Sequence, residues 1–190
     1  MALSDIALAS RALIRIGAAP IASFSDGTAE SEIAGALFGP IRDALLSSYS
    51  WSFATGQVAL SELETTPVAD FSKAFQLPVD FLRAISAGTS GKGRGLRFRI
   101  AGNCLHTDAQ AVLLTYIYRP DEETFPPYFD QALITRLAAE FTIPITENTS
   151  RAEAMFQMAE REFQQARQID AQQDTPNRID DFSLIQARTE

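Results

Sequence analysis

The stretch IRDALLSSYSWSFA, residues 41–54, decides the architecture that this sequence predicts. Upstream of it, apolar residues recur at helical spacing, whereas downstream of it short runs of β-branched and aromatic residues take over. This change in the spacing of apolar residues predicts that the stretch lies where helices meet a sheet. We expect its aromatic residues Tyr49, Trp51 and Phe53 to form a structural junction, because large rings stabilise such a contact by burying extensive surface.

Two helices are predicted before the junction. Apolar residues at helical spacing indicate a short amphipathic helix over residues 3–16. After a loop, Asp26 is the expected N-cap of a second helix that runs to about Ser48. Gly39 and Pro40 lie inside this second helix and should kink or split it, because proline cannot donate a backbone hydrogen bond.

The middle of the chain has strand composition. Gly102-Asn103 lies between two apolar runs and suits a two-residue hairpin turn. A flexible loop before this hairpin is marked by four glycines, Gly88, Gly91, Gly93 and Gly95. The predicted strands are residues 83–86, 96–100, 104–107 and 112–118.

Helical spacing returns near Pro126-Pro127, which is well placed for the first turn of a helix, and Pro144 is expected to end that helix. Residues 150–153 have the form of a capping box that opens a last helix to about Gln172. The expected buried face of this last helix is Met155, Phe156, Ala159, Phe163 and Ala166.

The order of these elements predicts an α+β fold that is mainly α. Residues 1–50 and 123–172 should form a helical bundle, interrupted by a small antiparallel β-rich lobe at residues 51–122. Residues 173–190 are polar, and we expect them to form an extended tail. The tail keeps a few apolar residues, which suit docking on a neighbouring protein: Phe182, Leu184 and Ile185.

Composition excludes several classes of protein. Of the 190 residues, 46% are apolar and 21% charged, which is ordinary for a folded domain. No apolar run approaches the length of a membrane span, and the first 20 residues do not follow the pattern of a secretory signal. Cys104 is the only cysteine, so an intrachain disulfide and a cysteine zinc cluster are impossible, and synthesis in a reducing cytoplasm fits.

The charge distribution is uneven. The net charge of -8 argues against a protein whose main task is to bind phosphates. Even so, no acidic residue lies between Asp80 and Asp108, so that the β lobe is locally basic. Contact with nucleic acid or an acidic protein competes here with the simpler interpretation of a solvated strand face. The basic residues concerned are Arg83, Lys92, Arg94, Arg97 and Arg99.

The sequence gives little support for an enzyme or a cofactor site. The loop AGTSGKGRG lacks the glycine and lysine spacing of a phosphate-binding loop, and a flexible loop is the better interpretation. Cys104, His106 and Asp108 alternate along a predicted strand and could share one face, yet they are favoured as ordinary strand residues rather than metal ligands. Nucleophilic mechanisms that need histidine would depend on His106 alone. We therefore expect no catalytic, metal or cofactor-binding residues.

The segment PIRDALLSSYSWSFATGQVAL, residues 40–60, resembles the hallmark of phage head-to-tail adaptors of the podovirus tail tubular protein A type. In that family an Arg-Asp-x-Leu-Leu run ends a helix and leads through Trp-x-Phe-Ala into the first strand. Similar pieces follow the same order elsewhere, such as KAFQLPVDFLRAI and the long segment that begins IAGNCLHTDAQ. The resemblance covers about residues 3–170.

This resemblance implies a non-enzymatic virion protein without cofactors. Members of the family form rings, typically dodecameric, between a portal protein and a tail, stopper or nozzle protein, and DNA passes through the channel during ejection. Gene transfer agents and defective phages use the same adaptor. Synthesis in the bacterial host cytoplasm is also implied. We expect the tail residues Phe182, Leu184 and Ile185 to dock on the portal, and a nucleic-acid-binding module using residues 83–99 is the alternative.

Overall fold

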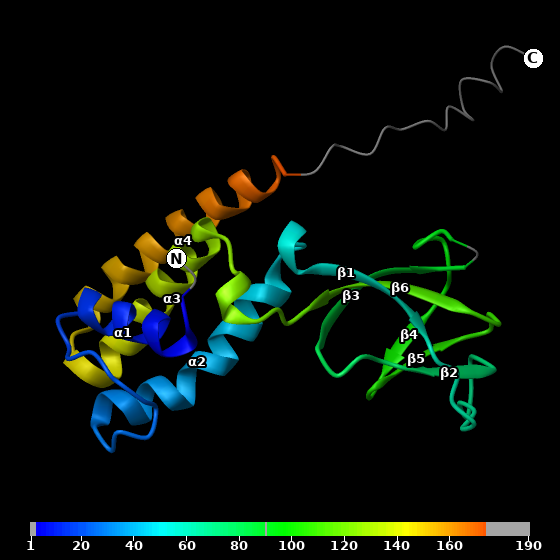
Figure 1. The fold of residues 1–190 in the computed structure, drawn as a ribbon, viewed down its shortest axis with the longest axis horizontal. Helices are drawn as coiled ribbons and strands as arrows, with labels where there is room; N and C mark the ends of the chain where they lie inside the picture. Colours follow the sequence, from blue (N-terminus) through cyan, green and yellow to red (C-terminus); the bar gives the residue numbers. More distant parts are fainter. Residues whose placement is uncertain (1–2, 90, 174–190) are drawn as a thin grey trace, which may run out of the picture.

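The computed structural model describes residues 3–89 and 91–173, and it has the expected α+β fold, mainly α. Within these ranges the helices gather at one end of the molecule and the strands at the other (Figure 1). The α-helices are α1 (Asp5–Arg15), α2 (Ala29–Ser48), α3 (Pro127–Thr146) and α4 (Thr149–Asp170). The strands are β1 (Thr55–Leu60), β2 (Lys73–Gln76), β3 (Phe81–Gly88), β4 (Arg99–Ala101), β5 (Cys104–Thr107) and β6 (Val112–Tyr118).

The first two helices begin at side-chain caps. The Ser4 hydroxyl accepts a hydrogen bond from the backbone N–H of Ala7 at the start of α1. Helix α2 begins with a reciprocal capping box between Thr28 and Ser31, so the prediction that Asp26 is its N-cap was wrong. Asp26 instead accepts hydrogen bonds from backbone N–H groups of the preceding loop, where Gly27 adopts a positive φ.

Two prolines lie inside continuous helices. Helix α2 runs through Pro40 to Ser48 without a break, so it is not split there. Helix α3 continues past Pro144 to Thr146, and the expectation that Pro144 ends it was wrong. Because Pro144 lies in the last turn, its missing N–H removes only one hydrogen bond from the helix. The C-cap of α3 is Glu147, a residue of left-handed conformation whose N–H donates to the Ile143 carbonyl.

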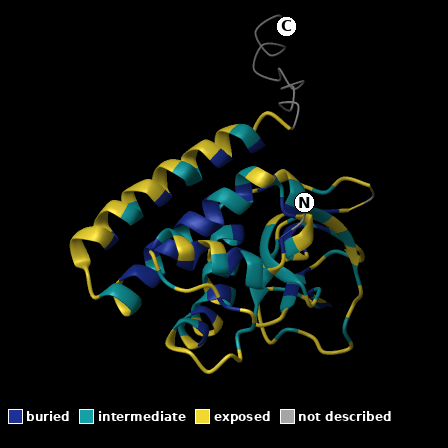
Figure 2. Ribbon diagram, turned by 60° about the vertical axis from the view of Figure 1, so that its left-hand side comes forward, coloured by how far each residue is buried: buried dark blue, intermediate teal, exposed yellow. Residues whose placement is uncertain are grey.

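Helix α4 packs along α3 with small residues. Its cap is Asn148, which accepts from the N–H of Arg151, so the capping box predicted at residues 150–153 is not formed. On the predicted inner face Ala159 and Ala166 are buried, whereas the larger Met155, Phe156 and Phe163 are only half-buried. Figure 2 shows that the outer face of this helix, which leads to the C-terminal end, is largely exposed. None of the helices in the described ranges is long and apolar enough to cross a membrane.

The strands form two three-stranded antiparallel sheets, ordered β1-β6-β3 and β2-β5-β4. Segments next to the strands extend the pairing at two sheet edges: Leu63, after β1, donates its N–H to the Ala74 carbonyl of β2 (2.8 Å), and Leu96, before β4, donates its N–H to the Ala87 carbonyl of β3 (2.9 Å). These connections help to satisfy backbone groups that sheet edges would otherwise leave unpaired. Between the sheets lies a second hydrophobic core, separate from that of the helices, and its fully buried side chains include Phe75, Leu105 and Leu114.

The structure corrects part of the strand prediction. The hairpin turn at Gly102-Asn103 is confirmed, with Gly102 at φ 58° between β4 and β5. However, residues 96–98 lie outside β4, and their backbone is held by other groups, such as the Thr107 hydroxyl donating to the Arg97 carbonyl. Strands β1 and β2 were not predicted from alternation, because Gly56 and the short KAFQ run give a weak signal.

Asp130, in the first turn of α3, gives a test of helix packing. Burial raises the pKa of its carboxyl from 3.8 to about 6, although Arg11 acts to lower it. Within the described part of the chain its buried Oδ1 has no hydrogen-bond partner. Because the pKa is higher in the folded than in the unfolded state, the ionised carboxylate destabilises the fold. Stability is therefore lost as the pH rises from about 4 to about 6.

We therefore predict that Asp130→Asn raises the Tm at pH 7.5 by roughly 2–4 °C, as expected when one poorly solvated buried charge is removed. The difference from wild type should shrink as the pH falls from 6 to 4 and disappear below about pH 3, where Asp130 is protonated in both states. Differential scanning calorimetry across this pH range checks it, with Asp121→Asn, at an exposed carboxyl, as the control. A Tm difference that is the same at all pH values would contradict the assignment.

Candidate functional site

Trp51 is the centre of the junction between helices and sheets. Its side chain is fully buried, and its ring lies against those of Tyr49, Phe129 and Phe163, with centroids 5.0–5.7 Å apart. The indole N–H donates to the Leu45 carbonyl (3.1 Å), near the end of α2. One side chain thus joins α2, α3 and α4, and replacing such a residue with alanine typically costs about 3–5 kcal/mol.

Phe53 extends the same cluster to the sheet. It lies in a single 3₁₀ turn, Ser52–Ala54, that connects the helix end to β1. Its ring packs edge-on against Phe125 and Tyr128, at centroid distances of 6.0 and 6.3 Å. Its carbonyl accepts a hydrogen bond from the Tyr118 hydroxyl of β6. The residues expected to form the junction, Tyr49, Trp51 and Phe53, therefore lie together at the place where the helices meet the sheets.

A charged network joins α2 to the chain segment after β6. Arg42 donates to Asp43 (2.9 Å) and to Glu122, and Asp43 also accepts from Arg119 (Nε to Oδ1, 3.0 Å). Burial acts to lower the pKa of Arg42, but the hydrogen bonds from Asp43 and Glu122 outweigh it and raise that pKa. The Arg-Asp pair of the stretch 41–54 thus connects two segments that are far apart in sequence.

Asp170, the last residue of α4, makes a second polar connection. Its side chain is only 2% exposed. It accepts hydrogen bonds from the backbone N–H of Ser52 (2.9 Å), the Ser52 hydroxyl (2.7 Å) and the Tyr128 hydroxyl (2.8 Å). Burial and the hydrogen bond to Asp170 raise the pKa of Tyr128 to about 12. A buried carboxylate is stable here because three donors replace its lost hydration.

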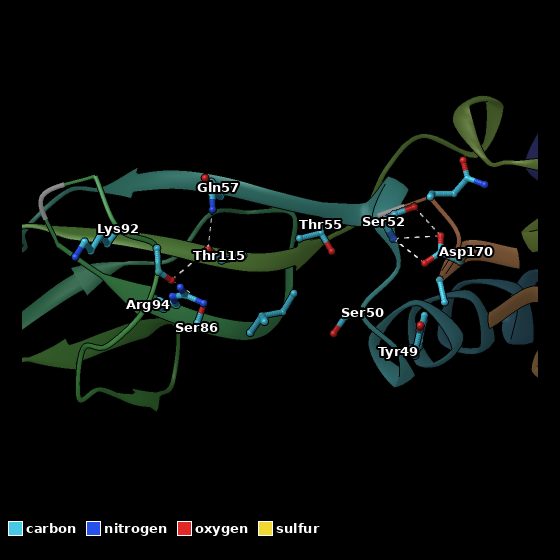
Figure 3. Close-up of a pocket in the computed structure, with 14 residues that line it drawn as sticks. Tyr49, Ser50, Ser52, Thr55, Gln57, Ser86, Lys92, Arg94, Thr115 and Asp170 are labelled. Carbon is cyan, nitrogen blue, oxygen red and sulfur yellow. Dashed lines mark hydrogen bonds between the residues drawn. The ribbon is translucent and has the colours of Figure 1, made fainter. Parts of the chain in front are cut away.

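Next to Asp170 a cleft of about 990 Å³ opens between the helices and the sheet β1-β6-β3 (Figure 3). Its walls carry hydroxyl and amide groups, and its far end is formed by the glycine-rich loop with Lys92 and Arg94. The loop packs closely against the sheet: a Cβ on Gly93 would lie 2.7 Å from the Thr115 hydroxyl oxygen, and the Gly93 carbonyl accepts from Ser86 Oγ. Glycine is required for this approach, which places the loop with Lys92 and Arg94 at the end of the cleft.

The five basic residues of the lobe do not form one patch. Lys92 and Arg94 line the cleft, and Arg83 lies at its edge, where Nη2 donates to the Ser50 hydroxyl (3.0 Å). Arg97 lies over the Phe71 ring, and Arg99 pairs with Asp70 (3.2 Å). The structure therefore divides the basic residues of the lobe into two groups, one at the cleft and one, Arg97 and Arg99, that contacts Phe71 and Asp70.

The metal hypothesis gains no support from the structure. Cys104 and His106 are half-buried on one face of β5, as their alternation predicts, but Asp108 lies beyond the strand and accepts from the N–H and hydroxyl of Ser72. Within residues 3–89 and 91–173, no three His, Cys, Asp or Glu side chains are grouped so that they could hold a metal ion. Phe182, Leu184 and Ile185 lie outside the described residues.

Asp170 and the Arg42 network were not identified from the sequence. A signal for Asp170 exists, because it follows Ala159, Phe163 and Ala166 at intervals of four, three and four residues, and so continues the inner face of α4. An acidic residue on such a face must find buried donors.

Comparison of the sequence with models of protein families gave no match, and comparison with curated proteins gave none either.

The contacts of Asp170 and Asp108 predict that these two carboxylates differ in their contribution to the free energy of unfolding. Asp170→Ala should lower the free energy of unfolding by roughly 2–3 kcal/mol, because it leaves the Ser52 and Tyr128 donors without their acceptor. Asp108→Ala removes the same kind of contact, to the N–H and hydroxyl of Ser72, at an exposed position, and should cost less than about 1 kcal/mol. Urea unfolding followed by Trp51 fluorescence measures both. Equal losses would show that Asp170 does not hold the junction.

Proposed function

We propose that this chain is a non-enzymatic head-to-tail adaptor subunit of a phage or phage-like particle, such as a gene transfer agent. Copies of the chain would form a ring, as a dodecamer, between a portal protein and a tail, stopper or nozzle protein. The subunit would be made in the cytoplasm of the bacterial host and become part of the virion. Its task would be mechanical, namely to continue the channel through which DNA leaves the head.

The observation that carries this proposal is the place of residues 41–54 in the fold. The resemblance to the adaptor family rests on this stretch, and it implies a helical bundle with an inserted β region. In the structure the stretch supplies the end of α2, the buried Trp51 and the turn into β1, and so joins the two parts. The local role of the stretch agrees with the architecture that the resemblance implies.

The charge of the chain supports the same proposal. Its net charge of -8 suits a channel wall along which DNA must slide without binding, since like charges repel at distances up to the Debye length. Lys92 and Arg94 do not contradict this role of the net charge, because they line the junction cleft, at the end opposite Asp170. A ring also needs two different complementary faces on each subunit.

One candidate for such a face lies on the helices. A groove of about 350 Å³ between α2, α3 and α4 is lined by Pro40, Ile41 and Phe163 together with the ion pair of Arg136 and Glu140. Phe163 and Arg136 are of the residue types that are enriched in protein interfaces. We propose that this groove contacts the neighbouring subunit of the ring.

The proposal predicts that the purified chain, mixed with the portal protein of the same particle, sediments as a ring or a portal-bound assembly. The reason is that each ring contact is weak alone and becomes stable when the ring closes on its template. Analytical ultracentrifugation of the mixture and of each component alone measures this. A chain that stays monomeric and unbound at high concentration would remove the main support for the adaptor function.

The same measurement assigns the portal contact. A chain that ends at Gln172 lacks Phe182, Leu184 and Ile185, and it should no longer bind the portal although its circular dichroism and Tm stay close to those of the full chain. Portal binding that survives this truncation would refute the assignment to the tail and leave the adaptor function itself standing.

A nucleic-acid-binding module is the second candidate, favoured by the exposure of Arg97 and Arg99 on the β lobe. It predicts duplex DNA binding at low salt that weakens when both arginines are replaced with alanine, with a salt slope reduced by roughly 2 in log K against log salt. Fluorescence anisotropy measures it, and Arg161→Ala at an exposed site of α4 is the control. Absence of binding at low salt would exclude this candidate.

A further inference from the structure

The junction cleft lies where the described chain ends. Asp170, Ala171 and Gln173 all line it, so that the last described residue of the chain belongs to the cleft wall. The cleft is at the upper end of the sizes typical of ligand pockets, about 300–1,000 Å³, and it is long enough to extend from the end of α4 to the glycine-rich loop (Figure 3). A segment attached at its wall has a high effective concentration there.

The charges of the cleft and of this segment are complementary. Lys92 and Arg94 lie at the end of the cleft opposite Asp170, and both are exposed. Asp170 lies at the other end of the cleft, where it is buried and its oxygens accept from Ser52 and Tyr128. Residues 174–185 contain three aspartates and one arginine, a net charge of -2, and two of the aspartates are adjacent, at Asp180-Asp181.

The spacing along the chain fits the same arrangement. Asp180 is seven residues beyond Gln173, which in an extended chain reaches about 23 Å. This reach suits a segment that crosses a cleft of this size and places its carboxylates at the cations. Apolar residues flank the aspartate pair, at Ile179 and Phe182, and Ile85 on the cleft wall is an exposed apolar side chain, 38% accessible, that they could cover.

We propose that residues 174–185 of each chain bind in the junction cleft of the same chain, with Asp180 and Asp181 paired to Lys92 and Arg94. The occupant is the chain's own segment because the cleft wall is its point of attachment, which spares the entropy cost of bringing two molecules together. The inference does not depend on ring formation. Under the function proposed above, it would keep Phe182 covered in the free subunit until a portal competes for the segment.

Hydrogen exchange of the full-length protein tests the proposal. At low salt the backbone amides of residues 182–185 should exchange at least about tenfold more slowly than those of an unstructured peptide. The pair of changes Lys92→Glu and Arg94→Glu should abolish this protection, as should Asp180→Lys with Asp181→Lys. All four changes together should restore it, because the charges are then exchanged between the two sides.

Arg97→Glu with Arg99→Glu is the matched control, since it makes the same change of charge on the lobe at residues that contact Phe71 and Asp70 instead of the cleft. These changes should leave the protection intact. Unprotected amides in the wild type, or four changes that fail to restore protection, would overturn the proposal. Protection that increases with protein concentration would overturn it too, since it would mean that the segment binds a second copy of the chain.

Discussion

The burial of Trp51 is the constraint on which the rest of the structure depends. Helices α2, α3 and α4 all contact this ring or its neighbours, and the chain turns into β1 directly after it. A side chain of this size contributes several kcal/mol by leaving water, a large part of the net stability of a domain. Its indole N–H must also be satisfied, and the Leu45 carbonyl fixes the ring relative to the end of α2.

Apolar packing alone would leave the angle between helices and sheets loosely defined, because the hydrophobic effect has no direction. Two polar connections supply direction. Asp170 binds the turn at Ser52 to the end of α4. Asp43 and Arg42 bind α2 to the segment after β6, through Arg119 and Glu122 respectively. Displacement is most costly at Asp170, since a buried charge that loses its partners is strongly destabilising. The junction therefore combines a buried aromatic core with polar contacts that fix its orientation.

The fold also separates charges that share one region of sequence. Arg97 and Arg99 face Phe71 and Asp70, whereas the glycine-rich loop carries Lys92 and Arg94 back to the cleft. Surface electrostatics therefore depend on where the loop packs rather than on composition. In an acidic chain, two cations in a cleft whose wall includes the last described residues are a specific feature, and they would give the C-terminal segment a local partner.

The sequence by itself determined the order of the helices, the place of strands β3 to β6 between them, the mainly α character of the fold and the hairpin turn at Gly102-Asn103. These features depend on the spacing of apolar residues within a short segment and on the conformational freedom of glycine. Both can be identified from neighbouring residues in the sequence. The aromatic junction was also predictable, because three large rings in five residues have few alternatives to a core.

Only the tertiary structure decided the remainder. The helix caps at Thr28 and Asn148, the continuation of α3 past Pro144 and the short strand β2 depend on small energies that packing overrides. The burial of Asp170 required Ser52 and Tyr128, which are 118 and 42 residues away, to converge on it. Contacts between residues so far apart are created by the fold, and no local pattern of one sequence specifies them.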